Sequence, residues 1–237
     1  MNKTSNQQWT QRPTKGSKNW IFVVILVLAS ALSGCAASRS DLTGVFTQPP
    51  ERNLGAEKVS VFFLFRHLSQ QHGLDALPKV KPQGVPDFEN IFRGALGEIT
   101  NISEYATHTE FPTDVNAPER RREQEELRQT HDYTIDIRFF EEASFKQQFL
   151  SGTISLVSLT LIPAPYTWEY TITADVYNVK GTLVKSYQRQ ATLSNWVEAL
   201  LIFAYPFHPI EGKREEIYVE SLHDIFRQIE TEKVLGK

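Results

Sequence analysis

The alternation of apolar and polar residues predicts the elements of the first half of the chain. The β-branched and aromatic run Val59–Phe65 predicts a buried central strand. Apolar residues over 88–99 recur at the spacing of one helical face and predict a helix there. A weaker strand is expected over 102–109. A very polar helix is expected over 119–129, where the arginine run at 120–122 lies among glutamates and predicts a solvated face.

The second half of the chain reads as a set of strands followed by a helix. Residues 133–139 and 168–177 alternate in the way that half-buried strands do. A hairpin turn is predicted at Asn178–Gly181, with a return strand over 182–193. Apolar residues over 217–229 form one face of a closing helix.

This element order predicts an α/β (α+β) fold class. Helical crossovers in the first half imply parallel strand pairing, and the hairpin in the second half implies an antiparallel meander. We therefore expect a mixed sheet of about five strands, with about three helices packed on it.

Two apolar segments do not fit this alternation. Phe149–Pro165 carries no charge, and Trp196–Pro209 carries only Glu198. Following the predicted strands up and down the sheet places both segments at the same end of it.

Two interpretations of these segments stay open. The first is a long buried strand at 153–162 with a core helix at 196–205, because apolar runs of this length commonly form core. The second is an apolar patch that contacts lipid or a protein partner. The contact patch would comprise Leu156, Leu159, Leu161, Trp196, Leu200, Ile202, Phe203 and Tyr205.

The first 34 residues have the pattern of an export signal. Four lysines and arginines, and no acidic residue, precede the apolar run Trp20–Leu32. A basic region followed by an apolar run of about a dozen residues is typical of secretory signals. The run is shorter than the roughly 20 residues that a membrane-spanning helix needs.

The run ends in Leu32-Ser33-Gly34-Cys35, which resembles the lipobox of bacterial lipoproteins. The resemblance implies that Cys35 carries diacylglycerol, that the chain is cut between Gly34 and Cys35, and that no cysteine thiol is left for catalysis. Ala36 follows where an aspartate would favour retention in the inner membrane, so the resemblance implies the periplasmic face of the outer membrane.

The predicted organisation has three parts. Residues 1–34 are the signal peptide, and 35–57 are the lipidated cysteine with a flexible tether, because this stretch is polar and contains prolines. Residues 58–237 form a single periplasmic domain. In element order this domain resembles small α/β domains of envelope lipoproteins: the penicillin-binding-protein activators, the curli secretion-channel lipoprotein and the domain before the Tol-system propeller.

Composition and motifs give no sign of catalysis. The net charge of −3 does not indicate nucleic-acid binding, and one cysteine excludes an internal disulfide. Nucleotide-binding, zinc-protease and serine-hydrolase motifs are absent from the sequence. His67 and His72 are five residues apart, which does not suit a shared metal on one helical face.

We therefore expect no enzyme activity, no cofactor and no metal. The expected function is that of a non-enzymatic envelope component, anchored through the lipid on Cys35 and bound to a protein partner. A carrier or sensor of lipid or another small molecule is one alternative. A periplasmic hydrolase of unrecognised type is another, and Glu141 and Glu142 are adjacent carboxylates that such an enzyme could pair.

Overall fold

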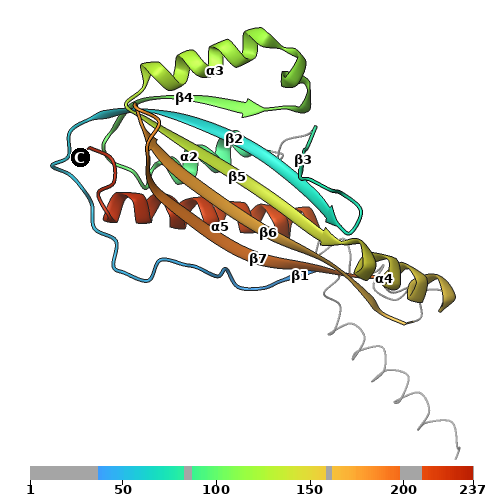
Figure 1. Cartoon of the computed structure of the whole chain (residues 1–237). Helices are drawn as coiled ribbons and strands as arrows, with labels where there is room; N and C mark the ends of the chain where they lie inside the picture. The colour runs from blue at the N-terminus through green and yellow to red at the C-terminus, as the bar shows by residue number, and fades with distance from the viewer. Residues whose placement is uncertain (1–36, 83–86, 159–161, 198–209, 237) are drawn as a thin grey trace, which may run out of the picture. The chain divides into compact units, whose positions relative to one another are not determined.

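The computed structural model describes residues 37–82, 87–158, 162–197 and 210–236. These residues form one mixed sheet with helices on both of its faces (Figure 1). The predicted fold class is confirmed, although the sheet has seven strands rather than about five. The two extra strands, β1 (Ala37–Arg39) and β3 (Lys79–Val80), are too short to produce an alternating pattern.

The strand order is β1-β7-β6-β5-β2-β3, and β4 also pairs with β2. The parallel half consists of β2 (Val59–His72), β4 (Ile102–Glu110) and β5 (Tyr133–Ser144), with β2 between the other two. The antiparallel half consists of β6 (Ala164–Asn178) and β7 (Leu183–Val197), which follow β5. Both halves therefore have the directions that the sequence predicts.

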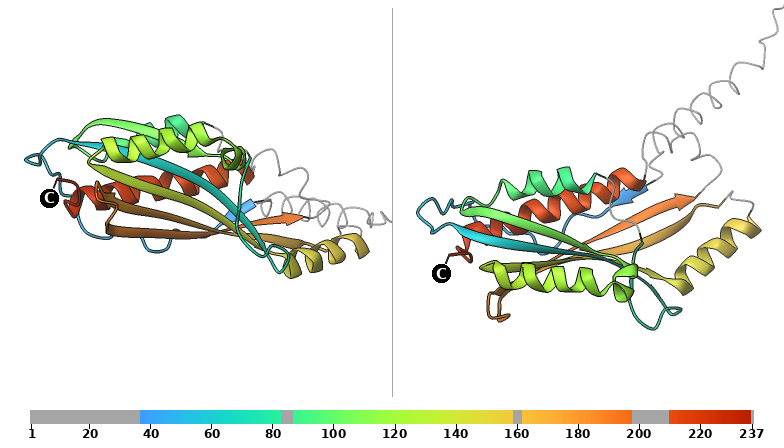
Figure 2. Two further views of the ribbon diagram at one scale, coloured as in Figure 1. Left: turned by 45° about the horizontal axis from the view of Figure 1, so that its top comes forward. Right: turned by 90° about the horizontal axis from the view of Figure 1, so that it is seen from above.

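The two crossovers of the parallel half place helices on opposite faces. Helix α2 (Phe88–Leu96) connects β2 to β4, and α3 (Pro118–Thr130) connects β4 to β5. Because β4 and β5 lie on opposite sides of β2, right-handed connections put α2 and α3 on opposite sheet faces. Figure 2 shows this arrangement, with the closing helix α5 (Ile210–Thr231) beside α2.

Coverage of both faces explains why the apolar run in β2 is continuous. Every side chain from Val61 to Phe65 is at most 1% exposed. Phe63 contacts Phe92 of α2, with ring centroids 4.9 Å apart, and Phe226 of α5 at 5.8 Å. Phe62 points to the other face, where its ring lies 6.2 Å from that of His131, which directly follows α3.

The antiparallel half, in contrast, is covered on one face. Alternate residues of β6 and β7 pack under α5, for example Ile172, Ala174 and Leu193. Between them lie Thr171, Thr173, Gln188, Gln190 and Thr192, which form what we call the open polar face. An antiparallel pair with one packed and one solvated face gives the clean alternation from which these strands were predicted.

The prediction of a flexible tether over 36–57 is wrong for the described residues, which begin at Ala37. Strand β1 pairs with β7, and the following chain runs along the sheet edge and α5 (Figure 1). Thr43 and Gln190 exchange two backbone hydrogen bonds, of 2.8 and 3.2 Å. The backbone amides of Phe46 and Asn53 donate to carboxylates of α5. This segment is therefore a packed part of the domain.

Candidate functional site

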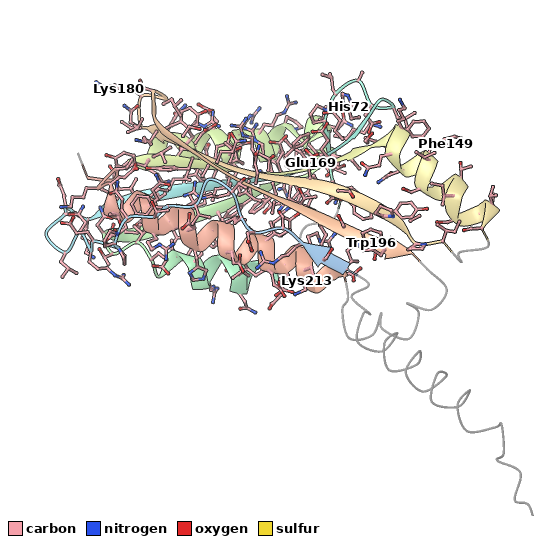
Figure 3. The ribbon with its side chains drawn as sticks, turned by 90° about the horizontal axis from the view of Figure 1, so that it is seen from below. His72, Phe149, Glu169, Lys180, Trp196 and Lys213 are labelled. Carbon is pink, nitrogen blue, oxygen red and sulfur yellow. The ribbon has the colours of Figure 1, made fainter. Side chains whose placement is uncertain are left out.

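The most unusual surface of the domain is the helix α4 (Phe145–Val157), which follows β5 and packs against β6. Leu156 is 77% exposed, Val157 80% and Phe149 66%. We use the term apolar end for the exposed apolar side chains of this helix and its neighbours: Phe145, Phe149, Leu150, Ile154, Leu156, Val157, Ile162 and Trp196. Figure 3 shows Phe149 and Trp196 at one end of the domain and Lys180 at the other.

The burial pattern of α4 is the reverse of that of an ordinary surface helix. Its two buried residues are Ser151 and Ser155, one helical turn apart. The Ser151 hydroxyl donates to the Pro165 carbonyl oxygen over 2.7 Å, which fixes the helix to the start of β6. Gly152 lies beside Tyr166, whose hydroxyl would be 3.5 Å from a Cβ placed there. Small residues thus bring α4 close to the strand, while its large apolar residues face outward.

The two apolar segments do emerge from the same end of the sheet, as the sequence predicts. Ala164 at the start of β6 pairs with Val197 at the end of β7. The interpretation of 153–162 as a buried strand is wrong, because the chain is helical up to Val157 and largely exposed there. A helix does not show the alternation of a strand. In α4 the side chains that face the domain are serines instead of apolar residues.

The structure places two of the predicted contact residues on the surface. Leu156 is exposed, and Trp196 is 39% exposed opposite Pro165. The remaining predicted residues lie outside the described part of the chain: Leu159, Leu161, Leu200, Ile202, Phe203 and Tyr205, together with Gly34 and Cys35. Sequence reasoning missed Phe145, Phe149, Leu150, Ile154 and Val157. The signal that could have identified them is the pair of serines at i and i+4, preceded by Ser144, whose side chain accepts the Gln147 amide as an N-cap.

Strand β1 begins at this same end of the sheet. Ala37 pairs with Asn195 of β7, and Asn195 pairs with Tyr166 of β6. These three residues form a row across the sheet, at the level where α4 packs on β6. Because β1 runs antiparallel to β7, the chain enters the domain from the apolar end.

A second group of interest is the buried imidazole of His67 on the helix-covered face. Its ring stacks on Phe139 with centroids 4.8 Å apart and meets Phe88 edge-on at 5.5 Å. Burial lowers the pKa of His67 to about 4, and the cations Lys81 and Arg214 act in the same direction. With 4% of its surface exposed, the neutral ring is part of the core and is closed to a substrate.

We expect this histidine to make stability depend on pH. A histidine whose folded-state pKa lies below its ordinary value of 6.5 stabilises the fold fully above pH 6.5. That contribution is lost as the pH falls towards 4, because the unfolded chain takes up the proton first. The loss amounts to about 3 kcal/mol. About 2 kcal/mol of this loss falls between pH 7 and pH 5, where urea unfolding measures it, and His67→Phe, which keeps an aromatic ring, should remove that part of the dependence. An equally steep dependence in the variant would contradict this assignment.

On the opposite sheet face, paired carboxylates lie in a charged network. Asp136 and Asp175 are direct neighbours across β5 and β6, and both are buried. Arg66 lies 3.2 Å from Asp136, and Arg138 pairs with Asp175. Burial, partly offset by Arg66 and Arg138, raises the pKa of Asp136. The two carboxylates and the two guanidinium groups form ion pairs between neighbouring strands. We therefore assign Asp136 and Asp175 a structural role.

The adjacent carboxylates considered for hydrolysis are separated by their partners. The Glu141 carboxylate accepts a hydrogen bond from the Lys81 ammonium over 2.6 Å. Glu142 lies 3.6 Å from His72, on the other side of the strand. Neighbouring residues of a strand point to opposite faces, so these two acids do not converge on one substrate.

Polar groups also line a shallow hollow of about 280 Å³ beside the N-terminal segment, formed by Ser40, Thr43, Glu169, Tyr170, Thr171, Gln190, Ala191 and Thr192. Its lining of hydroxyl, amide and carboxylate groups is unlike the apolar cavity that a lipid carrier requires. Within the described ranges, no cluster of three or more histidine, cysteine or acidic residues could hold a metal ion. In the same part of the chain, no helix has both the length and the apolar character needed to cross a membrane.

Comparison with known proteins gives little further information. No protein-family model matches the chain, and no curated protein matches it. Two crystal structures of the PelC dodecamer from Paraburkholderia phytofirmans are similar at 12% identity, with TM-scores of 0.28 and 0.29. They align with 81% and 80% of this chain, and with 99% and 96% of their own chains. Similarity at this level does not bear on what the chain does.

Proposed function

We propose that this protein is a bacterial lipoprotein, held in the cell envelope by lipid on Cys35 and acting as a non-enzymatic interaction component. The observation that carries the proposal is the sequence Leu32-Ser33-Gly34-Cys35 at the end of a basic and then apolar leader.

The start of the folded domain supports an anchor at this position. Strand β1 begins at Ala37, two residues after Cys35. Two residues span at most about 7 Å, so lipid on Cys35 would hold the domain directly against the bilayer. Each buried CH₂ group contributes about 0.8 kcal/mol, and two or three acyl chains would make this attachment effectively permanent. Ala36 favours the outer membrane as the location.

Mass spectrometry of the protein extracted from membranes tests the anchor. We expect the mature chain to begin at Cys35, and its N-terminal peptide to carry the mass of diacylglycerol and an added acyl chain. Recovery of an intact N-terminus at Met1, or of an unmodified Cys35 peptide, would overturn the proposal.

The role proposed for the anchored domain is to bind a protein partner in envelope transport, secretion or maintenance. The open polar face supports this role, because it offers uncharged hydrogen-bonding side chains on a rigid sheet, and α2 and α5 cover the other face. A photoreactive residue at Gln188 in intact cells should give a discrete cross-linked species. The same residue at Arg122, on the solvated surface of α3, serves as the control. Equal yields of cross-linked species from both positions, or no cross-linked species from either position, would count against a partner on this face.

A further inference from the structure

We propose that the apolar end inserts into the surface of the membrane that holds the protein, so that the side chains of α4 lie among lipid headgroups and upper acyl chains. This inference rests on the proposed lipidation of Cys35. It adds a second, non-covalent membrane contact and fixes which end of the domain faces the bilayer.

The first argument is the reversed burial of α4. A helix at a protein–water surface turns its apolar side chains toward the core and its polar side chains outward. In α4 the serines face β6, whereas Phe149, Leu156 and Val157 project away from the domain. Such a helix suits surroundings that are apolar on its outer side.

The second argument is the distribution of charge. Lys146, in the first turn, is the one charged residue of α4, and the next charge in the chain is Glu169. The stretch from Gln147 to Trp168 is therefore uncharged throughout. Charged side chains are costly in the bilayer, so an uncharged stretch fits a segment in contact with lipid.

The third argument is the position of the anchor, which selects a bilayer as the occupant of this surface. Ala37, Asn195 and Tyr166 lie on three neighbouring strands, which are about 5 Å apart, and α4 packs on the last of these strands. The acyl chains on Cys35 would therefore enter the membrane beside the apolar end. The opposite end is far away, because the 15 residues of β6 extend about 45 Å to the Asn178 turn.

Both tryptophans of the folded domain lie at the same end of the sheet. Trp168 and Trp196 are the two tryptophans that follow Cys35 in the sequence, and Tyr166 lies between them on the sheet. Tryptophan and tyrosine favour the boundary between water and hydrocarbon. Trp196, which is 39% exposed, therefore reports on the proposed contact without any substitution, whereas Trp168 packs partly against the core.

The test uses the lipidated, full-length mature protein in lipid nanodiscs. Since Cys35 is the sole native cysteine and would be blocked by lipid, Leu156→Cys gives one reactive thiol for a fluorescent label. Val179→Cys is the matched control, because Val179 is also an exposed apolar residue, at 58%, but lies in the hairpin at the opposite end. Lipids with a quencher on the acyl chain should remove most of the fluorescence at position 156 and none at position 179.

Three results would overturn the inference. Equal quenching at both positions would mean that the domain has no fixed orientation. No quenching at position 156, with the label open to a water-soluble quencher, would mean that α4 stays in water. Protection from both quenchers would mean that a protein, such as a second copy of this chain, covers α4.

Two measurements make the test independent of the variants and of the anchor. Brominated lipids should quench the intrinsic tryptophan fluorescence of the unsubstituted protein. Unchanged tryptophan fluorescence would contradict the inference, and misfolding of a variant could not explain it. Mass analysis of the Cys35 peptide from the same sample reports lipidation. Lipidated protein without quenching refutes the α4 contact alone, whereas unlipidated protein refutes the proposed function.

Discussion

Replacing Cys35 with serine is expected to abolish processing completely, so that the protein accumulates with residues 1–34 still attached. The resemblance to lipoproteins implies that the lipid must be attached to sulfur before the leader is cut. A serine hydroxyl provides no thioether, and the apolar run at 20–32 would then remain on the chain. The intact mass of the protein and the incorporation of a labelled fatty acid measure this directly.

The control for this prediction is Ser33→Ala, which keeps a small residue in the predicted cleavage motif and should be processed normally. A further variant joins residues 36–237 to a general secretory signal, which supplies no lipid. This protein should be released from the membrane by washing at high pH, whereas the lipidated protein should not. Normal processing of the serine variant would show that Cys35 is not the lipidated residue.

Much of the fold could be predicted because it follows from periodic patterns. The alternation in 168–177 arises from one buried and one solvated face, and the unbroken run from Val61 to Phe65 arises from helices on both faces. In each case the number of covered sheet faces determines both the burial of the side chains and the hydrophobic pattern in the sequence. The strand directions then follow from the lengths of the connections between strands.

The helix α4 could not be predicted in this way, because it buries its polar residues. Ser151 and Ser155 lie at the correct spacing for an inward stripe, but methods based on hydrophobicity look for apolar residues there. The uncharged composition of 149–165 did indicate that the segment was exceptional. It could not decide between core and surface, because both environments exclude charge.

The segment over 37–57 was misjudged for a different reason. Its contacts use backbone groups and single side chains, such as the amide of Phe46 and the carboxylate of Asp224, which are 178 positions apart. Such contacts leave no periodic signal. A stretch of polar residues and prolines is compatible with a flexible tether and with a packed edge, and long-range partners decide which one forms.

The ion pair between Arg189 and Asp224 is expected to be the most important single contact for that segment. Both side chains are at most 5% exposed, and Nε of Arg189 donates to the Asp224 carboxylate over 2.6 Å. The same carboxylate accepts the Phe46 amide at 3.0 Å, so one group joins β7, α5 and the N-terminal segment. Asp224→Asn would leave a buried guanidinium without its counter-charge, which typically costs about 3–5 kcal/mol.

Urea unfolding measures this loss, and Glu220→Gln on the same helix is the control. Glu220 pairs with Arg39 near the surface, and removal of an exposed pair should cost less than about 1 kcal/mol. The double variant Arg189→Met with Asp224→Leu removes both charges and should be more stable than Asp224→Asn. Equal unfolding free energies for Asp224→Asn and Glu220→Gln would contradict the proposed importance of the buried pair.

Limited proteolysis connects the same substitution to the membrane. If Asp224 holds the N-terminal segment, Asp224→Asn should expose the chain around Phe46 to cleavage, and Glu220→Gln should not. Strand β1 keeps its own contacts in this variant, because it pairs with β7 and because Arg39 pairs with Glu216 and Glu220. The domain should therefore stay close to the bilayer, and the lipid quenching expected at the apolar end should be unchanged. A loss of quenching in Asp224→Asn would show instead that the contact at Phe46, and not β1, sets the distance between this domain and its membrane.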